Sequence, residues 1–306
     1  MKIEIIYYIS AFILTFFGVE LFRRWSLKRQ ILDIPNERSS HSTPTPRGGG
    51  IIFVGVCLIF CIIWNLEFGI WSYLSGAILL AVISWIDDLK SVPSILRFTV
   101  HFISAGLIIY GFGLFQIVRF PYIGDIQLNY FALPITLLWI VWLTNAYNFM
   151  DGIDGIAAAQ AITAGIGWYL LGYKFDIPFT GFLGMILALT NSAFIFHNWS
   201  PAKIFMGDVG SAFLGFSFAF LPLSAAKEST QNTSKFFLIG VLFVLPFMFD
   251  TVFTFIRRLL NGEKVWQAHR SHLYQRLVIG GYSHRFVTTL YGIISLLIIA
   301  VTLIFV

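Results

Sequence analysis

About ten long apolar runs fill most of this sequence, and they constrain the fold more than any other feature. They cover residues 3–22, 50–66, 70–86, 96–118, 130–145, 155–172, 178–196, 209–226, 236–256 and 286–306. A run of about 20 apolar residues crosses the hydrocarbon core of a bilayer as a helix. Lipid offers the backbone no hydrogen-bond partners, and the alternating segments of a membrane barrel are absent from the sequence. The predicted fold class is therefore all-α, a polytopic integral membrane protein with about ten transmembrane helices.

The composition excludes an ordinary water-soluble protein. Only 11% of the residues are charged and 58% are hydrophobic, whereas a soluble domain has about 25% charged residues. The net charge of +5 does not indicate a nucleic-acid partner, because the basic residues follow the loops between the apolar runs. Neither a linker nor an internal repeat divides the chain, so we expect one transmembrane domain over residues 1–306.

The charged residues predict the orientation in the membrane. Fifteen of the 20 Lys and Arg residues fall on one side of the ten runs, which the positive-inside rule places in the cytoplasm. The first run lacks a cleavage site and is followed by Arg23 and Arg24, so we interpret it as a retained anchor. The same side carries six of the nine aspartates: Asp33, Asp87, Asp88, Asp151, Asp154 and Asp208. We therefore expect an active-site cleft at the cytoplasmic face.

The first two cytoplasmic loops each contain a short polar motif. PTPRGGG places Arg47 and three glycines directly before a span, which suits a phosphate or simply a tight entry into the membrane. WIDDLK places Asp87 and Asp88 side by side, with Lys90 as the only base in that motif. Adjacent acids repel without a cation nearby. A metal site, a proton-transfer role and a solvated helix end all remain open for this pair.

The third loop, NAYNFMDGIDG, is more specific. Asn145, Asn148, Asp151 and Asp154 recur every three residues, so they line one strip if the segment is helical. The segment contains no Lys or Arg, and its oxygen-bearing side chains resemble the ligands that Mg2+ prefers. A cluster of helix-capping residues is the alternative.

The fourth loop, NWSPAKIFMGDVGS, adds Asn198, Lys203, Phe205 and Asp208. Asp208 begins the next span, where a carboxylate also suits a helix N-terminus. With this residue, five carboxylates lie on three short loops of one membrane face: Asp87, Asp88, Asp151, Asp154 and Asp208. Their mutual repulsion favours a bound cation.

The last cytoplasmic loop contains AHRSH, which places His269 and His272 three residues apart around Arg270. These residues suit a metal, a phosphate or acid–base chemistry, and a basic membrane-surface loop is the alternative. Zinc is not indicated, because no cysteine accompanies them. Asp250, inside the ninth run, is either functional or part of a structural ion pair.

Taken together, PTPRGGG, DDLK, NAYNFMDGIDG, NWSPAKIFMGDVGS and AHRSH resemble a known family. It is the family of polyprenyl-phosphate N-acetylhexosamine-1-phosphate transferases, glycosyltransferase family 4, in the superfamily of the phospho-MurNAc-pentapeptide translocase. The similarity runs in order over about residues 33–276, and it is greatest to the initiators of bacterial surface polysaccharides such as O-antigen.

The resemblance implies an enzyme of the bacterial inner membrane with its active site facing the cytoplasm. It would transfer N-acetylhexosamine 1-phosphate from a UDP-N-acetylhexosamine to undecaprenyl phosphate, using Mg2+ with Mn2+ as a substitute, and release UMP. The partners are these two substrates and membrane lipid, and a homodimer is common among relatives. The implied catalytic residues are Asp87, Asp88, Asp151, His269 and His272. The implied substrate-binding residues are Arg47, Asn145, Asn148, Asp154, Asn198, Lys203, Phe205 and Arg270. The implied metal ligands are Asp208 and Asn148.

The chemistry favours direct in-line attack by the lipid phosphate on the β-phosphorus, because a phosphate monoester with a second pKa of about 6 is mostly a dianion at neutral pH. A covalent intermediate on Asp87, Asp88 or Asp151 is the alternative course. Two other functions also fit parts of the sequence. A Mg2+-dependent membrane prenyltransferase shares the Asp-rich inner loops, and an anionic-lipid transporter would carry its charges near the bilayer midplane.

Overall fold

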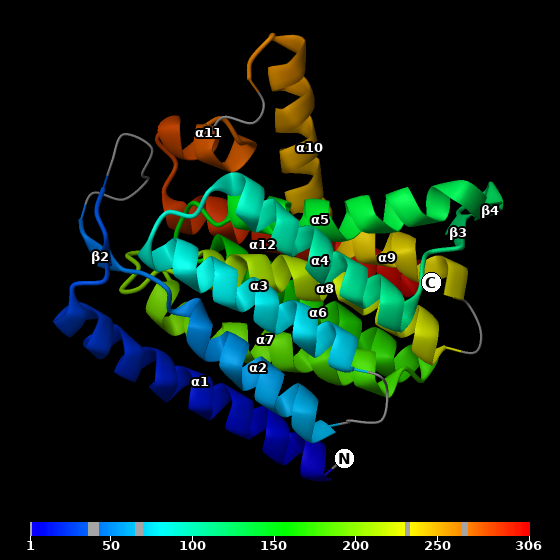
Figure 1. Ribbon diagram of the computed structural model, residues 1–306, viewed down its shortest axis with the longest axis horizontal. Helices are drawn as coiled ribbons and strands as arrows, with labels where there is room; N and C mark the ends of the chain where they lie inside the picture. Colours follow the sequence, from blue (N-terminus) through cyan, green and yellow to red (C-terminus); the bar gives the residue numbers. More distant parts are fainter. Residues whose placement is uncertain (1, 36–42, 65–69, 230–232, 265–268) are drawn as a thin grey trace.

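The computed structural model describes residues 2–35, 43–64, 70–229, 233–264 and 269–306. It is all-helical in its main elements, as predicted, with two short antiparallel strand pairs (Figure 1). The helices are α1 (Lys2–Arg29), α2 (Gly50–Trp64), α3 (Trp71–Leu89), α4 (Ser94–Phe112), α5 (Ala132–Met150), α6 (Ile156–Phe175), α7 (Pro178–Asn198), α8 (Asp208–Glu228), α9 (Phe236–Phe243), α10 (Leu245–Leu260), α11 (Leu273–Ile279) and α12 (His284–Phe305). The strands are β1 (Leu32–Asp33) with β2 (Thr45–Pro46), and β3 (Ile117–Phe120) with β4 (Gly124–Gln127).

The protein is a multi-pass membrane protein, although fewer helices qualify as spans than we expected. Each of the ten predicted runs coincides with a helix, but within the described residues seven helices are long and apolar enough to cross a membrane, or eight with one bent pair. Helix α2 has only 15 residues in the described part of its run. Helix α6 falls short because Gln160, Thr163 and several glycines lower its mean hydropathy.

Two predicted runs end or break where the backbone requires it. The run over 96–118 stops being helical at Phe112, because Gly113 adopts a φ of 84° and the chain turns into β3. The run over 236–256 is divided into α9 and α10, which meet at 71°. Pro246 lies at the start of α10 and has no N–H for the preceding turn. Helix α10 therefore leaves the bundle, as Figure 1 shows, and carries Asp250 with it.

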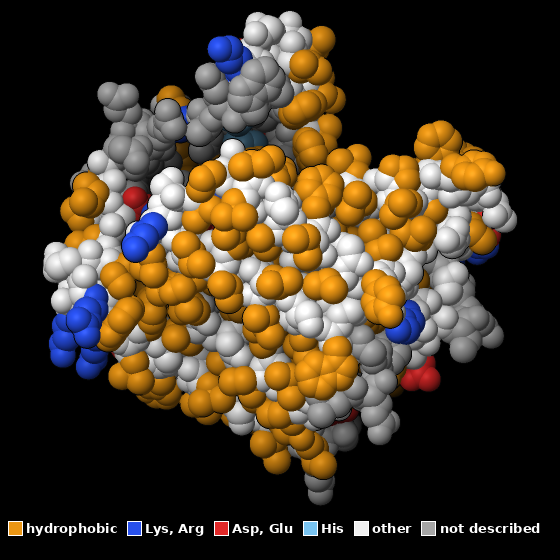
Figure 2. Space-filling model, viewed as in Figure 1, with side chains coloured by type: hydrophobic (Ala, Val, Ile, Leu, Met, Phe, Trp, Pro, Cys, Tyr) orange, Lys and Arg blue, Asp and Glu red, His pale blue; other side chains and the backbone are white. Residues whose placement is uncertain are grey.

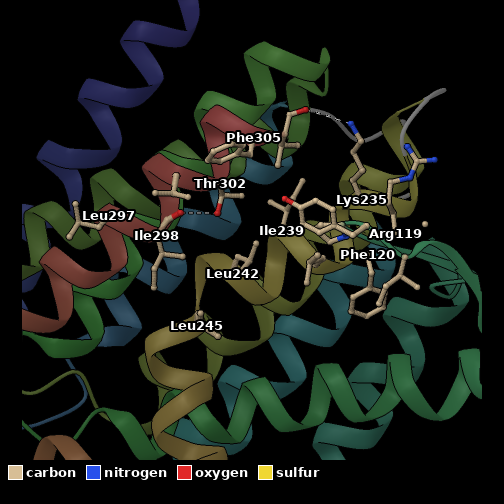
Figure 3. A pocket seen from close by; sticks show the side chains of 17 residues that line it. Arg119, Phe120, Lys235, Ile239, Leu242, Leu245, Leu297, Ile298, Thr302 and Phe305 are labelled. Atoms are coloured by element: carbon tan, nitrogen blue, oxygen red, sulfur yellow. Dashed lines mark hydrogen bonds between the residues drawn. The ribbon is translucent and has the colours of Figure 1, made fainter.

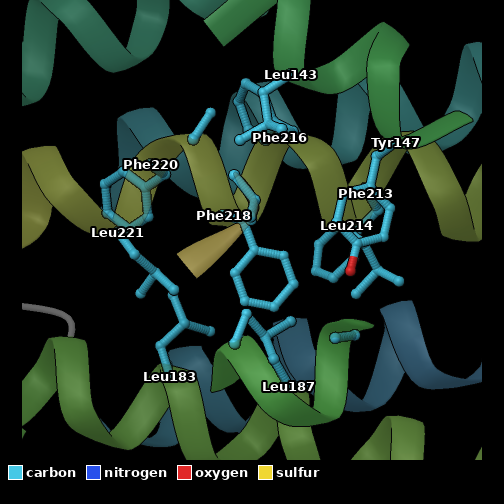
Figure 4. Close-up of a cluster of buried hydrophobic side chains, with 14 of the residues drawn as sticks. Leu143, Tyr147, Leu183, Leu187, Phe213, Leu214, Phe216, Phe218, Phe220 and Leu221 are labelled. Carbon is cyan, nitrogen blue, oxygen red and sulfur yellow. The ribbon is translucent and has the colours of Figure 1, made fainter. Parts of the chain in front are cut away.

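Helix α8 is the centre of the bundle. Every residue from Val209 to Ala225 is buried, against α2, α3, α5 and α7 among others. Figure 4 shows Phe218 beside Leu183 and Leu187 of α7, and this ring also stacks with Tyr147 of α5. Phe216 and Phe220 stack with Tyr73 of α3. The outer helices expose apolar side chains, which cover much of the face in Figure 2. This distribution fits a bundle whose surroundings are lipid.

The polar motifs gather at one end of the bundle, on the left in Figure 1. We call it the site end, and define it by Asp87, Asp151 and Asp208. The β3–β4 hairpin and the C-terminus lie at the opposite end (Figure 1). A cavity of about 930 Å³ lies there between α9, α12 and the hairpin, and apolar residues such as Leu242, Leu297 and Phe305 line most of it (Figure 3). None of the predicted site residues borders this cavity.

Candidate active site

Close glycine contacts bring the first-loop motif against the start of α8. A Cβ at Gly50 would lie 2.5 Å from the Cα of Gly210, so neither position has room for a larger residue. The amides of Gly49 and Gly50 donate to the carbonyls of Phe205 and Met206, at 3.0 and 2.8 Å. These two amides are therefore engaged in packing the entry to α2, and the part of this motif that faces the acids is Arg47.

Asp88 joins three elements at the site end. Its side chain is fully buried and accepts hydrogen bonds from Arg47 Nη2 (2.5 Å) and from the amides of Asp208 (2.9 Å) and Val209 (3.1 Å). The carboxylate thus caps the N-terminus of α8 and pairs with the guanidinium. Gly207 has a φ of 76°, and a Cβ there would lie 2.5 Å from Asp88 Oδ2. Asp88 holds the segment that presents Asp208.

Asp87 points to a different partner, which the sequence analysis missed. Its oxygens accept from the amide of Val92 and from Arg97 Nη1, both at 2.7 Å. The same Nη1 lies 3.4 Å from Asp208 Oδ2, so Arg97 bridges the end of α3 and the start of α8. Its Nε is buried without a hydrogen-bond acceptor in the described part of the chain. Lys90, the base nearest in sequence, is exposed instead.

The third-loop motif does not form one continuous strip, because α5 ends at Met150. Asn148 lies within hydrogen-bonding range of the Asp208 carboxylate. Asn145 turns away and donates to the carbonyl of Val141 (2.7 Å) and toward His101 Nδ1 (3.1 Å). The structure therefore places Asn148 at the acids and places Asn145 between α4 and α5.

Asp151 follows directly after α5 and lies close to three other acids. Burial raises the pKa of Asp151 well above its usual range, and the nearby charges of Asp208, Asp88 and Asp154 raise it further. No described residue donates a hydrogen bond to its side chain, so nothing internal offsets this charge. The acids from separate loops thus converge, as the sequence predicted.

Asp154 and Asn198 hold the loops around the acids in place. Asp154 Oδ2 lies 3.3 Å from His284 Nδ1 and accepts from the amide of Ala202 at 3.2 Å. Burial raises the pKa of Asp154, but the hydrogen bond and charge of His284 outweigh it and lower the pKa overall. Asn198 accepts from the amide of Gly155 and donates to the carbonyl of Ile204, at 3.0 and 2.9 Å. Both side chains are buried and engaged within the protein.

Phe205 and Lys203, both in the fourth loop, contact different parts of the bundle. Phe205 bonds through its backbone to Pro46 and Gly49, beside the entry to α2. Lys203 lines a groove with Arg23 and Phe196 at the edge of the bundle, and none of the aspartates described above borders this groove. The structure thus does not bring Lys203 together with the carboxylates.

The histidines of the last loop form a second cluster around Asp250. This buried carboxylate forms a hydrogen bond with His272 Nδ1 at 3.1 Å. It also caps the start of α11 by accepting hydrogen bonds from two backbone amides. The ring centre of His269 lies 4.9 Å from that of His272. Burial, together with the charges of His272 and Arg258, lowers the pKa of His269 to about 4. Arg270 lies between the two histidines and is partly exposed.

Tyr274 connects this second cluster to the end of α5. Its hydroxyl donates to the carbonyl of Phe149 at 2.9 Å, and the ring centres of His272 and Phe149 are 6.4 Å apart. A Cβ at Gly152 would lie 2.1 Å from the Tyr274 hydroxyl. The glycine after Asp151 is thus needed for this contact. The last loop therefore packs beside the acidic third-loop motif.

The donor set suits a hard divalent cation shared with a substrate. Asp208, Asp151 and Asn148 offer carboxylate and amide oxygens, and burial together with the neighbouring acids raises the pKa of Asp151. No group of three His, Cys, Asp or Glu residues in metal-binding geometry occurs in the described ranges. Mg2+ is usually bound through one or two carboxylates together with substrate phosphates.

Comparisons with known proteins identify the class. The model of glycosyl transferase family 4 matches residues 70–226. The probable undecaprenyl-phosphate N-acetylglucosaminyl 1-phosphate transferase of Bacillus subtilis is 31% identical over 272 residues, 86% of this chain and 74% of that protein. The decaprenyl-phosphate N-acetylglucosaminephosphotransferase of Mycobacterium leprae is 28% identical over 92% of this chain and 78% of its own length. A phospho-N-acetylmuramoyl-pentapeptide-transferase of Chloroflexus aurantiacus is 29% identical over 77% and 70%.

The chain belongs to glycosyl transferase family 4. It is an enzyme of that family, which confirms the family and the enzyme class predicted from the motifs. The match favours the sugar-1-phosphate transferase over the prenyltransferase and the transporter.

Proposed function

We propose that this enzyme transfers N-acetylglucosamine 1-phosphate from its UDP-sugar to undecaprenyl phosphate at the cytoplasmic face of a bacterial inner membrane, releasing UMP. The product would initiate a cell-surface glycan such as O-antigen. The observation that carries the proposal is the bridge made by Arg97 between Asp87 and Asp208, because it joins two separate loops around one charged centre. The names of the relatives support the choice of sugar and lipid.

The role that we assign to each residue follows from the hydrogen-bonding groups that its side chain has without a partner in the described part of the chain. Asp208 and Asp151, helped by Asn148, would hold Mg2+, which neutralises charge on the diphosphate of the donor. Arg97 has an unpaired buried Nε–H and lies between two carboxylates, so it would bind a phosphate oxygen once substrate enters. Asp87 orients Arg97 through their 2.7 Å contact. Phe205 is the aromatic residue of the fourth-loop motif and would stack on uracil.

The hydrogen bonds favour direct attack over a covalent intermediate on Asp87 or Asp88, and an intermediate on Asp151 stays the alternative course. Asp88 accepts from three donors, and Asp87 accepts from two. Oxygens engaged in this way are weak nucleophiles. Swinging Asp88 out would release the start of α8, and swinging Asp87 out would release Arg97 and the turn after α3. The lipid phosphate is already a dianion at neutral pH and needs little help from a base. The protein's main task is therefore to position two anions against each other.

The second cluster would act on the donor. His272 is held by Asp250, and His269 is neutral at pH 7 because of its lowered pKa, so it can accept or donate a hydrogen bond. Arg270 adds a positive charge between them. These three residues would contact the sugar or the phosphate of the UDP-sugar.

The test is a UMP-release assay with purified protein, undecaprenyl phosphate and UDP-N-acetylglucosamine. We expect Asp208→Asn and Asp87→Asn to lower turnover by at least about 100-fold, the effect typical of losing one preorganised electrostatic contact. Asp125→Asn is the matched control, since this acid pairs with Arg119 in the hairpin at the opposite end. Turnover near that of the wild type in Asp208→Asn would refute the site. UDP-N-acetylgalactosamine as a faster donor would refute the choice of sugar alone.

A further inference from the structure

A groove of about 660 Å³ runs between α1, the end of α7 and the loop that follows α7. It lies at the site end of the bundle, but none of the acids described above borders it. Its lining combines aromatic and aliphatic side chains with three basic ones, Arg23, Arg24 and Lys203. We call it the α1–α7 groove. The proposed transfer reaction assigns no task to it.

The apolar wall of the groove faces the membrane. Phe17, Leu21 and Phe196 expose 60%, 66% and 63% of their surfaces. They belong to α1 and α7, two of the helices that are long and apolar enough to cross a bilayer. Lipid acyl chains are therefore the medium in contact with this wall, and any occupant of the groove must present hydrocarbon on this side.

The basic wall of the groove, formed by Arg23, Arg24 and Lys203, carries a net positive charge and has unused hydrogen-bond donors. Glu20 accepts from Arg23 at 2.8 and 2.9 Å and from Arg24 at 2.7 Å, so one carboxylate orients two guanidinium groups. Each guanidinium has five N–H donors, and most of them stay available. No residue in the described part of the chain forms a hydrogen bond or ion pair with the Lys203 ammonium. The three basic side chains and the single carboxylate of Glu20 thus leave the groove with a net charge of +2.

We propose that the α1–α7 groove binds one anionic diacyl phospholipid of the inner leaflet. The headgroup phosphate would lie on Arg23, Arg24 and Lys203, and an acyl chain would lie along Phe17 and the other apolar side chains. Basic clusters at the cytoplasmic ends of spanning helices attract anionic headgroups in this way. The acceptor lipid is a poorer fit, because its phosphate must reach the carboxylates, and neither α1 nor α7 carries one of them.

An occupied groove would also steady the catalytic loop. Lys203 lies in the loop that carries Asp208, and its amide donates to the carbonyl of His197 at 2.8 Å. The neighbouring amide of Ala202 donates to Asp154. A phosphate that bridges Arg24 on α1 and Lys203 on this loop ties a membrane helix to the site. The enzyme should therefore work faster in bilayers that contain anionic phospholipid, and this second statement rests on the proposed function.

Binding is tested without any activity readout, by native mass spectrometry of the purified protein with phosphatidylglycerol or phosphatidylcholine. Removing one basic contact near a membrane surface weakens binding about fivefold, so Arg24→Gln/Lys203→Gln should retain phosphatidylglycerol about 30-fold less tightly. The matched control is Lys28→Gln/Arg29→Gln, which removes two exposed charges from the same helix end outside the groove. Equal losses in both double variants would overturn the proposal, since the effect would then be general electrostatics.

Activity is then measured in vesicles of phosphatidylcholine with and without phosphatidylglycerol. We expect Arg24→Gln to turn over like the wild type in phosphatidylcholine and to lose the stimulation by phosphatidylglycerol. If undecaprenyl phosphate displaces phosphatidylglycerol from the groove, and Arg24→Gln raises the KM for that lipid, the groove is an acceptor site and the proposal fails. If phosphatidylglycerol binds as expected while no UMP is formed with any UDP-sugar, the proposed function fails and the lipid site stands.

Discussion

Replacing Asp250 by asparagine is the sharpest test of how the last loop is held. The side chain of Asp250 is fully buried in α10, and its two oxygens accept five hydrogen bonds. Oδ1 accepts from His272 Nδ1 (3.1 Å), Leu273 N (2.8 Å) and Thr254 Oγ1 (3.2 Å), and Oδ2 accepts from Tyr274 N (3.1 Å) and Tyr291 Oη (2.7 Å). One carboxylate thus joins α10, α11 and α12.

The expected loss of stability follows from this geometry. An asparagine has one oxygen and one NH2 group, so its NH2 must face the amide of either Tyr274 or Leu273. That buried amide loses its acceptor, which costs about 1–3 kcal/mol. The remaining bonds change from charge-assisted to neutral and lose about half their strength. Together these effects predict that Asp250→Asn lowers the free energy of unfolding by about 4 kcal/mol.

The assay is reversible denaturation in mixed micelles, with the free energy of unfolding obtained for each variant. Tyr291→Phe is the control, because it removes a single hydrogen bond to the same carboxylate and should cost about 1–2 kcal/mol. The order of the two losses is what the structure predicts. An Asp250→Asn protein as stable as Tyr291→Phe would show that the carboxylate does not join the three helices.

Three further predictions concern the acids and their neighbours. Arg97→Gln should lower the rate of UMP release at least about 100-fold while the protein stays folded, and an unchanged rate would contradict the bridge to Asp87 and Asp208. Gly152→Ala should lower the melting temperature, because its Cβ would lie 2.1 Å from the Tyr274 hydroxyl, and adding Tyr274→Phe should restore part of the loss. Chelation with EDTA should stop UMP release, and excess Mg2+ should restore it; activity that persists in EDTA would contradict the cation site.

The helices were predictable because their length and apolarity are local properties of the chain. Every predicted run contains a helix, and the errors lie where a single residue interrupts an otherwise apolar segment. Gly113 ends α4 with a positive φ, and Pro246 begins α10 after a bend. Both residues are visible in the sequence. Counting apolar residues hides them, because phenylalanine, leucine and valine continue on either side of the interruption.

The acids of the site were predictable, but their partners were not. Adjacent acids need a base, and the sequence offers Lys90 three residues after Asp87, yet Arg97 makes the contact. The reason is the turn between α3 and α4, which brings the first turn of α4 back over the end of α3. Asp88, one residue along the same helix, faces Arg47 from another loop. Such pairings depend on how helices are placed in space, and no spacing rule reports that.

The acids differ in whether their oxygens accept hydrogen bonds from backbone amides. Asp88, Asp154 and Asp250 each accept hydrogen bonds from backbone amides of other segments, so they are committed to holding helix ends and loops. Asp151 and Asp208 accept none from backbone amides in the described chain, and they lie between the loops that the others hold. A carboxylate whose oxygens accept fewer hydrogen bonds has more capacity left to bind a substrate or a cation. The identical residue type therefore serves two purposes at one membrane face, and the hydrogen-bond donors around each carboxylate decide which purpose it serves.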